Sequence, residues 1–362
     1  MRLTLGNVIA LAMLLAFLAS PILGSLSDRY DLKRPLLLFF SVLATVGLFF
    51  LGRVGYYQAL TLFVISLSSV HIANVFYNGL LADISDETDV GRIGGVGVGI
   101  GYLGSISAIL LSLLFMDSRG FSFLFQLTAL IMIVFYFPLI LSSRGPSLSR
   151  AKASFYGMLT DVFKNMRLSL SESIKELKWR RFLMARFWYL WAINGASFFA
   201  VLYGAETIKI SDYQMQLILI TGIMFAIPSG IFWGWLVDLI DSLFVLKTSA
   251  FVFFVILFLG ALIPILGLPQ STWWIVGVAS GISVAGIYVS ERSLVLTLAP
   301  KNKVGECFGV YNMAGRLAAI AAPFSWGFIS VTLSLGQVVA VSYLSVCGFI
   351  SFLVLTQIRM GK

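Results

Sequence analysis

Residues 24–34 of the chain are GSLSDRYDLKR and residues 234–238 are GWLVD, so a Gly-x-Leu-x-Asp block ends two apolar segments that lie 210 positions apart. A second correspondence, offset by 214 positions, relates residues 80–96 to residues 294–310, which carry similar apolar residues and glycines at six positions. Internal repeats of this kind predict that the two halves of the chain fold alike. Parallel repeats are typical of membrane transporters whose halves rock about a central site.

The composition is far too apolar for a water-soluble protein. Of the 362 residues, 59% are hydrophobic and 11% are charged, and the mean hydropathy is +0.97, whereas about a quarter of the residues of a soluble domain are charged. A soluble enzyme is therefore excluded. The net charge of +9 does not indicate nucleic-acid binding, because the basic residues lie mainly in loops between apolar segments. Cys307 and Cys347 fall inside apolar segments and indicate neither a disulfide framework nor a metal site.

Eleven apolar segments are long enough to cross a bilayer, which takes about 20 helical residues each. We therefore predict an all-α polytopic membrane protein with two helical bundles, five helices in residues 1–141 and six in residues 183–362. Residues 142–182 form a linker in which apolar residues at helical spacing predict an amphipathic helix lying on the membrane surface, with a partner-binding helix as the alternative. The eleven segments cover residues 5–24, 35–51, 60–82, 93–116, 121–141, 183–204, 215–239, 243–265, 273–298, 307–331 and 338–357.

The distribution of basic residues predicts the orientation in the membrane. If the N-terminus is external, alternation of the segments puts 18 of the 25 Lys and Arg residues on the inner side and four on the outer side. Cytoplasmic loops carry such an excess of basic residues. The linker and the C-terminus are therefore predicted to be cytoplasmic, in a multi-pass protein for which the plasma or inner membrane of the cell is favoured over an organelle membrane.

The repeat predicts one helix more than the segments provide. The Gly-x-Leu-x-Asp block ends the second helix of the C-terminal half but the first helix of the N-terminal half. We therefore expect a twelve-helix pattern whose first helix is missing, either because the true start codon lies upstream or because the gene is truncated. The first 20 residues imitate a secretory signal peptide, but the repeat makes them the counterpart of a later spanning helix.

Residues 24–34 resemble the signature that follows the second helix in the major facilitator superfamily, with Asp31 at a position where that signature has glycine. Residues 76–104 and 292–311 are similar to one branch of the superfamily, the vacuolar amino-acid effluxer-like family, also called the unknown major facilitator family. The resemblance implies the two-bundle fold of that superfamily and transport of amino acids.

The resemblance also implies a conformational latch at the cytoplasmic ends of the helices. In the superfamily the residue matching Asp28 faces the start of the helix that here spans residues 307–331, and the neighbouring arginines, Arg29 and Arg34, pair with an acid that corresponds to Asp83. Asp238 is the repeat equivalent of Asp28. A carboxylate is favourable at a helix N-terminus, and a charge cluster can hold two halves in one state. The alternative is that these charges only anchor the topology.

Several polar residues lie near the predicted membrane midplane. Arg316 is nine residues inside its segment, or roughly 14 Å, and an ionisable group at such depth is a candidate functional residue. We predict that Arg316 binds a carboxylate or another anion. The alternative is a structural ion pair with an acid such as Glu291. The residues predicted to supply hydrogen bonds to the substrate are Asn312, Asn194, His71, Asn74 and Tyr102.

Glu291 and Arg292 form a second group of candidate residues near the cytoplasmic end of their helix. Glu291 shares a helix face with Tyr288, three residues earlier, and is a candidate for proton uptake that drives transport. It is equally a candidate counterion of Arg292 or Arg316. The sequence does not distinguish these roles.

The leading functional hypothesis is therefore a secondary active transporter that moves a small polar solute by alternating access, with amino acids as the candidate substrate and the proton as the candidate coupling ion. The phosphate-binding pattern of ATP-driven pumps does not occur in the sequence. The alternative is a transport-inactive or truncated membrane bundle with a structural or sensory role. The partners expected are the lipid bilayer and a small molecule, without nucleic acid, and the sequence predicts no enzyme activity, catalytic residue, metal site or cofactor.

Overall fold

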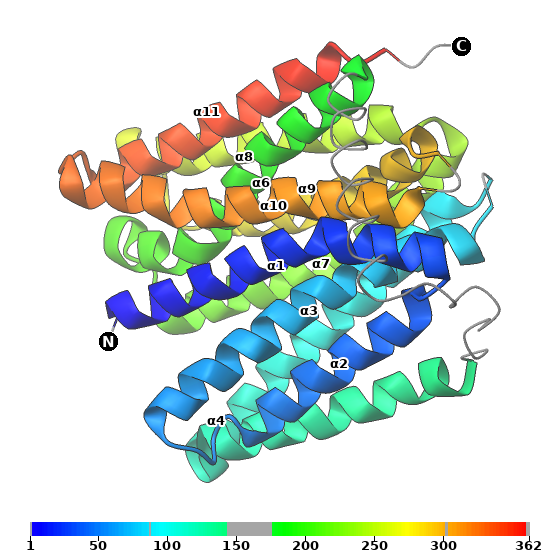
Figure 1. Cartoon of the computed structure of the whole chain (residues 1–362). Helices are drawn as coiled ribbons and strands as arrows, with labels where there is room; N and C mark the ends of the chain where they lie inside the picture. Colours follow the sequence, from blue (N-terminus) through cyan, green and yellow to red (C-terminus); the bar gives the residue numbers. More distant parts are fainter. Residues whose placement is uncertain (1, 87, 143–175, 301–302, 360–362) are drawn as a thin grey trace. The chain divides into compact units, whose positions relative to one another are not determined.

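The computed structural model describes residues 2–86, 88–142, 176–300 and 303–359, and every regular element in these ranges is a helix (Figure 1). Because a bilayer offers no hydrogen-bond partners, each spanning segment must satisfy its own backbone groups, and the helix does so. In chain order the elements are α1 (Arg2–Tyr30), α2 (Lys33–Phe50), α3 (Tyr56–Ile84), α4 (Val90–Ser142), α6 (Leu177–Tyr203), the π-helical turn η2 (Gly204–Ile208), α7 (Asp212–Leu239), α8 (Ser242–Ile265), α9 (Thr272–Leu298), α10 (Val304–Gly327), the π-helical turn η3 (Phe328–Thr332) and α11 (Gly336–Thr356).

The long helix α4 consists of two spans joined at Gly120. This glycine has a φ of 74° and a ψ of 177°, a conformation open to glycine but not to residues with a Cβ. The two candidate membrane spans within α4 are Val90–Met116 and Ser118–Pro138. The prediction of two spanning segments in this region is therefore confirmed.

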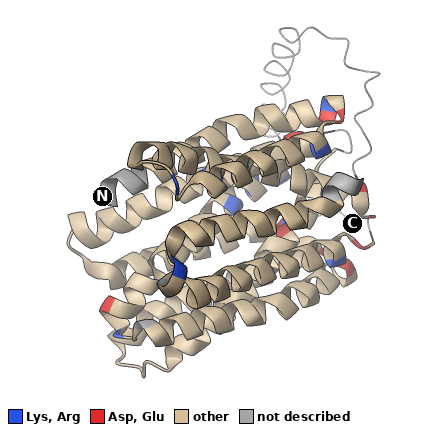
Figure 2. Cartoon of the chain, turned by 90° about the horizontal axis from the view of Figure 1, so that it is seen from below, with Lys and Arg blue, Asp and Glu red and all other residues tan. Residues whose placement is uncertain are grey.

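Ten helices of the described part of the chain are long and apolar enough to cross a membrane. The predicted eleventh span corresponds to α6, which is 27 residues long but carries four basic residues, among them Arg186. Figure 2 shows Lys, Arg, Asp and Glu mostly at the ends of helices, with few along their length. The all-helical fold class is confirmed, and α6 is the predicted span that is not among these ten candidate spans.

The contacts divide the chain into two compact units, which are described separately. Among the described residues, unit 1 contains those up to 84, from 107 to 142 and from 299 to 316, and unit 2 contains 85–106, 176–298 and 317–359. The division into residues 1–141, 142–182 and 183–362 remains a prediction. The amphipathic helix expected between residues 155 and 166 lies outside the described residues.

Each unit has its own apolar core. In unit 1, α1 and α2 both pack on α3, and Ala16, Leu37 and Phe76 are buried together at their contact. In unit 2, α9 packs on both α7 and α8, and α11 packs on α6 and α8. The core of this unit includes Val98 of α4 and Val289 of α9. Each core gathers side chains that are distant in sequence and so positions the polar residues carried by the same helices.

The short link between α1 and α2 turns at Asp31, which stands where the signature that residues 24–34 resemble has glycine. Asp31 has a φ of 54°, the left-handed conformation that glycine adopts without strain. Aspartate is one of the few other residues that tolerate this conformation. The turn therefore keeps a glycine-like backbone although the residue has changed.

Candidate functional site

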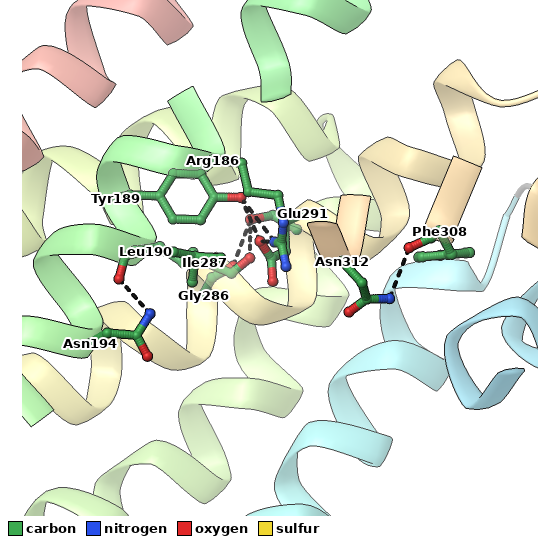
Figure 3. Close-up of polar contacts among 10 residues, drawn as sticks. Arg186, Tyr189, Leu190, Asn194, Gly286, Ile287, Glu291, Phe308 and Asn312 are labelled. Atoms are coloured by element: carbon green, nitrogen blue, oxygen red, sulfur yellow. Dashed lines mark hydrogen bonds and ion pairs between the residues drawn. The ribbon is translucent and has the colours of Figure 1, made fainter. Parts of the chain in front are cut away.

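A buried ion cluster links α6 to α9 in unit 2. Arg186 forms an ion pair with Glu291, and the hydroxyl of Tyr189 donates a hydrogen bond to the same carboxylate (Figure 3). Arg186 is 5% exposed, and Tyr189 and Glu291 are each 1% exposed. A charge buried this deeply is tolerated only when it is paired and hydrogen-bonded, so the three side chains form one polar unit.

Local helix geometry brings the cluster together. Arg186 and Tyr189 are three residues apart and therefore lie on the same face of α6. Packing of the two helices in unit 2 then brings Glu291 of α9 to that face, 105 residues further along the chain than Arg186. Arg292 follows Glu291 directly and is displaced by about 100° around the helix axis, so the two side chains leave α9 in different directions.

The sequence analysis placed Glu291 among candidate ion-pair residues but omitted Arg186 and Tyr189 from the site. A signal for Arg186 was present, because an arginine within an apolar segment is unusual and marks a candidate functional position. Nothing in the sequence identified its partner, since the two residues belong to different helices. The structure assigns to Arg186 the role of counterion that the sequence analysis divided between Arg292 and Arg316.

Unit 1 contains both His71 of α3 and Arg316 of α10. The charge of Arg316 acts on the His71 ring, and Arg316 Nη1 lies 3.8 Å from Met13 Sδ of α1. Both ring nitrogens of His71 are buried, and no described residue forms a hydrogen bond with either of them. Asn74 lies one turn from His71 on α3, where it is half-buried. A cationic group beside an unsatisfied imidazole is suited to an anionic ligand.

The two predicted asparagines bond to their own helices. In unit 1 the Asn312 amide donates to the Phe308 carbonyl at 2.8 Å, and in unit 2 the Asn194 amide donates to the Leu190 carbonyl at 2.7 Å (Figure 3). In each case the amide N–H group is engaged within its own helix, and Asn312 is only 4% exposed. Tyr102 of α4 packs beside the apolar core of unit 2.

The six predicted binding residues are thus divided between the two units. Unit 1 contains four of them and unit 2 contains Tyr102 and Asn194. Within unit 1 the charge of Arg316 acts on the His71 ring. A single central site formed by all six remains a prediction.

The sequence repeat reappears as two equivalent helix junctions, one in each unit. In unit 2, Asp238 at the end of α7 accepts hydrogen bonds from the backbone N–H groups of Gly91 and Arg92, at 2.7 and 2.9 Å, at the start of α4. In unit 1, Asp28 at the end of α1 accepts a hydrogen bond from the N–H of Glu306 at the start of α10, at 2.9 Å. Each carboxylate therefore satisfies backbone donors that a helix N-terminus leaves without an intrahelical partner.

Glycines bring the two helices of each junction into backbone contact. A Cβ on Gly234 would lie 2.3 Å from the Gly91 carbonyl oxygen, and a Cβ on Gly24 would lie 2.3 Å from the Gly305 carbonyl oxygen. Any larger residue would force the helices apart. The glycines that the two repeats share are therefore explained by close helix packing.

Asp83 forms an ion pair with a lysine that the sequence analysis did not single out. Lys33 Nζ lies 2.9 Å from Asp83 Oδ1, and the Asp83 side chain is 39% exposed. Lys33 lies within the same basic stretch as Arg29 and Arg34, the residues that the resemblance pairs with this acid. The region of the predicted charge cluster is therefore the same, but Lys33 has to be added to it.

Comparison with known proteins agrees with this architecture. The family model described as Major Facilitator Superfamily matches residues 2–323. The chain is 26% identical over 349 residues to a protein of Bacillus subtilis (strain 168) named uncharacterized MFS-type transporter YxiO, with 91% of this chain and 78% of that protein covered. It is 24% identical over 326 residues to an uncharacterized protein of Aquifex aeolicus (strain VF5), with 88% of this chain and 78% of that protein covered.

Two solved structures share the fold at low sequence identity. The human organic anion transporter MFSD10 (TETRAN) superposes with a TM-score of 0.75 at 18% identity, covering 97% of this chain and 83% of that chain. The proton:xylose symporter XylE superposes with a TM-score of 0.76 at 12% identity, covering 97% and 85%. At this level of identity the likeness concerns the fold alone.

Proposed function

The chain belongs to the Major Facilitator Superfamily, a superfamily of transporters rather than enzymes, and from this premise we propose that it carries a small solute bearing a carboxylate across a membrane by alternating access. The observation that carries the proposal is the position of Arg316 deep within α10 in unit 1, in the same unit as a buried His71 ring whose nitrogens form no hydrogen bond with any described residue. Arg316 lies twelve residues after Val304, the first residue of α10, or about 18 Å along the helix axis. A cation held at such depth in a membrane is a functional candidate by default.

The chemistry of the two side chains supports an anionic ligand. The guanidinium can donate two parallel hydrogen bonds to a carboxylate, and the imidazole can donate a third. Asn312, one turn before Arg316, keeps an amide oxygen that can accept a hydrogen bond from an ammonium group. These complementary groups, together with the resemblance to the amino-acid effluxer-like family, support an amino acid as the solute.

Transport by purified protein in proteoliposomes tests the proposal. We expect exchange of pooled labelled amino acids by the parent, little exchange by Arg316→Ala, and partial exchange by Arg316→Lys, which keeps the charge but not the paired donors. Arg119→Ala is the matched control, because Arg119 is an exposed cation of the same unit that lies over the Phe123 ring. Absence of exchange by the parent would refute amino-acid transport, and full exchange by Arg316→Ala would refute the site.

We further propose that Glu291 takes up the proton that couples transport to a pH gradient. The carboxylate is a partner of both Arg186 and Tyr189, so its protonation would release Arg186 from the ion pair. A protonation event that changes the partner of a buried charge can switch a protein between two states. We also propose that the linker, residues 142–182, lies in the cytoplasm and that the protein lies in the plasma or inner membrane of the cell.

Two modes of transport measured on the same variant test the coupling. Glu291→Gln protein that remains folded at the assay temperature, as checked by thermal unfolding, should lose stimulation by a pH gradient while keeping gradient-independent exchange, which needs no net proton movement. The control is Glu206→Gln, because Glu206 is exposed and accepts a hydrogen bond from Gln337 in unit 2. A pH-gradient response that survives in Glu291→Gln would assign coupling to another group, whereas loss of both modes would assign Glu291 to structure.

The latch remains part of the proposed mechanism. Asp28 and Asp238 each bind the start of another helix within their unit, through contacts that opening of the junction would break. Lys33 and Asp83 contribute an exposed ion pair beside the Asp28 junction, and Arg29 and Arg34 add positive charge to it. We propose that the two junctions stabilise one of the alternating states.

A further inference from the structure

Unit 2 contains a cavity of about 240 Å³ that neither the ion cluster nor the helix junctions use. Its walls come from α6, α7 and α9, with Phe253 of α8 and Tyr102 of α4 completing them. All of these residues belong to unit 2, so the cavity is a property of that unit alone.

The lining is mainly apolar. Trp273, Phe253 and Met215 contribute large apolar surfaces, while Tyr102, Ser197 and Ser280 are the lining residues that carry hydroxyl groups. Small-molecule sites typically combine an apolar wall with a few polar groups that orient the ligand. The cavity therefore suits an apolar group better than a charged or strongly hydrated one.

Tight packing beside the cavity argues against a simple packing defect. Three lining glycines, Gly222, Gly277 and Gly281, mark the crossing of α7 and α9. A Cβ on Gly281 would lie 2.1 Å from the Gly222 carbonyl oxygen, so the two backbones are already in contact. The space beside this crossing therefore cannot be closed by moving α7 and α9 closer together.

The size of the cavity indicates what can occupy it. An engineered apolar cavity of about 150 Å³ is enough to bind benzene. The present cavity is larger and is lined by aromatic side chains, which favour offset or edge contacts with another ring. An aromatic ring or a branched alkyl group with its linking atoms would fit.

The ion cluster lies further along the same helices. Ile193 lines the cavity and is four residues from Tyr189, and Val284 lines it and is seven residues from Glu291. These spacings correspond to about 6 and 10 Å along the helix axes. The environment in unit 2 thus changes from apolar to a closed ion cluster within two helical turns.

We propose that this cavity is a binding subsite for an aromatic or branched apolar group of the transported solute. The proposal rests on the proposed function and narrows its substrate class to amphipathic carboxylates, with aromatic amino acids as the form tested. Glycine, alanine and other small polar solutes would leave the cavity unfilled and would bind weakly.

Binding of two fluorinated amino acids to the protein in lipid nanodiscs tests the subsite. Fluorine NMR line broadening, corrected for empty nanodiscs, reports binding of para-fluorophenylalanine and of fluoroalanine, which share a head group but differ in the ring. We expect the parent to bind the aromatic probe about tenfold more tightly, because burial of the ring supplies the extra free energy.

Substitutions that fill the cavity provide the control for location. Ala200→Phe and Ser280→Leu fill it from α6 and α9, and each should weaken binding of the aromatic probe about tenfold while leaving fluoroalanine unchanged. Val201→Phe adds the same bulk at the neighbouring residue, which is 46% exposed and outside the lining, and should bind as the parent does. Thermal unfolding of each variant in the same nanodiscs shows which ones remain folded.

The outcomes separate the subsite from the proposed function. Equal binding of the two probes, no binding of either, or unchanged aromatic binding in folded cavity-filling variants would overturn the subsite, and a lipid chain that occupies the cavity would produce the second result. Aromatic-selective binding without flux in proteoliposomes would keep the subsite and refute transport. Flux of fluoroalanine equal to that of the aromatic probe would keep transport and refute the subsite.

Discussion

Glu291 of α9 and Arg186 of α6 form an ion pair that is almost completely buried, and the Tyr189 hydroxyl donates to the same carboxylate. Removing both charges from water costs free energy that their attraction repays only while the pair is intact. The pair therefore contributes less to the stability of the native state than the number of its contacts suggests. Its consequences appear when one partner is changed alone.

Breaking this pair should destabilise the protein far more than removing it. Arg186→Met and Glu291→Gln each leave a buried group without its partner in the pair, and we expect each to lower the free energy of unfolding by about 3–5 kcal/mol. The double variant Arg186→Met, Glu291→Gln should recover much of this loss, because the remaining groups are neutral and Tyr189 can still donate to the amide. Thermal unfolding of the detergent-purified proteins measures the difference, and a double variant as unstable as the sum of the two would contradict the pairing.

Packing at the helix junction of unit 2 should depend on Gly234 having no side chain. Gly234→Ala would bring a Cβ to within 2.3 Å of the Gly91 carbonyl oxygen, so we expect a loss of about 1–3 kcal/mol in the free energy of unfolding. Gly101→Ala is the matched control on α4, since a Cβ there meets nothing within 4 Å and alanine favours the helix by about 1 kcal/mol. Equal unfolding midpoints for the two variants would show that the backbones are not in contact.

The charge of Asp238 should stabilise the start of α4. Asp238→Asn keeps an acceptor oxygen for Gly91 but removes the charge from the helix N-terminus, which should cost about 0.3–1 kcal/mol, or up to about 2 kcal/mol because the side chain is only 4% exposed. Arg92→Gln is the comparison, because Arg92 is 63% exposed and its ion pair with Asp238 spans 3.7 Å. Exposed pairs contribute little, so this variant should unfold as the parent does. If Arg92→Gln lost more stability than Asp238→Asn, the contribution of Asp238 would come from its ion pair with Arg92 and not from its contact with the helix N-terminus.

Loss of the charge of Asp28 should change the balance between transport states. We expect Asp28→Asn to shift the population toward the inward-open state, because it weakens the bond from the carboxylate to the start of α10. Protease accessibility of the two membrane faces, measured in sealed vesicles, follows the shift. Asp31→Asn is the control in the same loop, since asparagine tolerates the left-handed backbone that Asp31 adopts. Identical cleavage of both faces in the parent and in Asp28→Asn would refute the latch.

The helices could be predicted from the sequence because each is decided by its own residues. A run of about 20 apolar residues in a bilayer has to form a helix to satisfy its backbone, whatever its neighbours are. The break at Gly120 was predictable for the same local reason. The sequence is less apolar at α6, because Arg186 lowers its hydropathy and a residue that compensates for this charge lies in α9.

The family resemblance and the repeat together predicted part of the candidate site, since the resemblance implies that Asp28 faces a helix start and the repeat makes Asp238 its equivalent. Asp28 and Asp238 occupy equivalent positions in sequence, and each proves to bind the start of another helix. This was possible because the repeat preserves both the acid and the glycines that allow the helices to meet. Glu291 was identified as an ion-pair candidate because a carboxylate inside an apolar segment must find a partner.

By itself, then, the sequence determined the number and type of the elements, their internal repeat and the polar residues that a membrane interior makes conspicuous, because all of these follow from local composition and spacing. Only the tertiary structure decided that Arg186 is a partner of Glu291 and that Lys33 contacts Asp83 at 2.9 Å. It also decided that both His71 nitrogens are buried without a hydrogen bond to any described residue, and that a cavity remains beside the crossing of α7 and α9. These features depend on how each helix is rotated about its axis against a helix far away in the chain. That rotation is fixed by the packing of all its neighbours together and leaves no local pattern in the sequence.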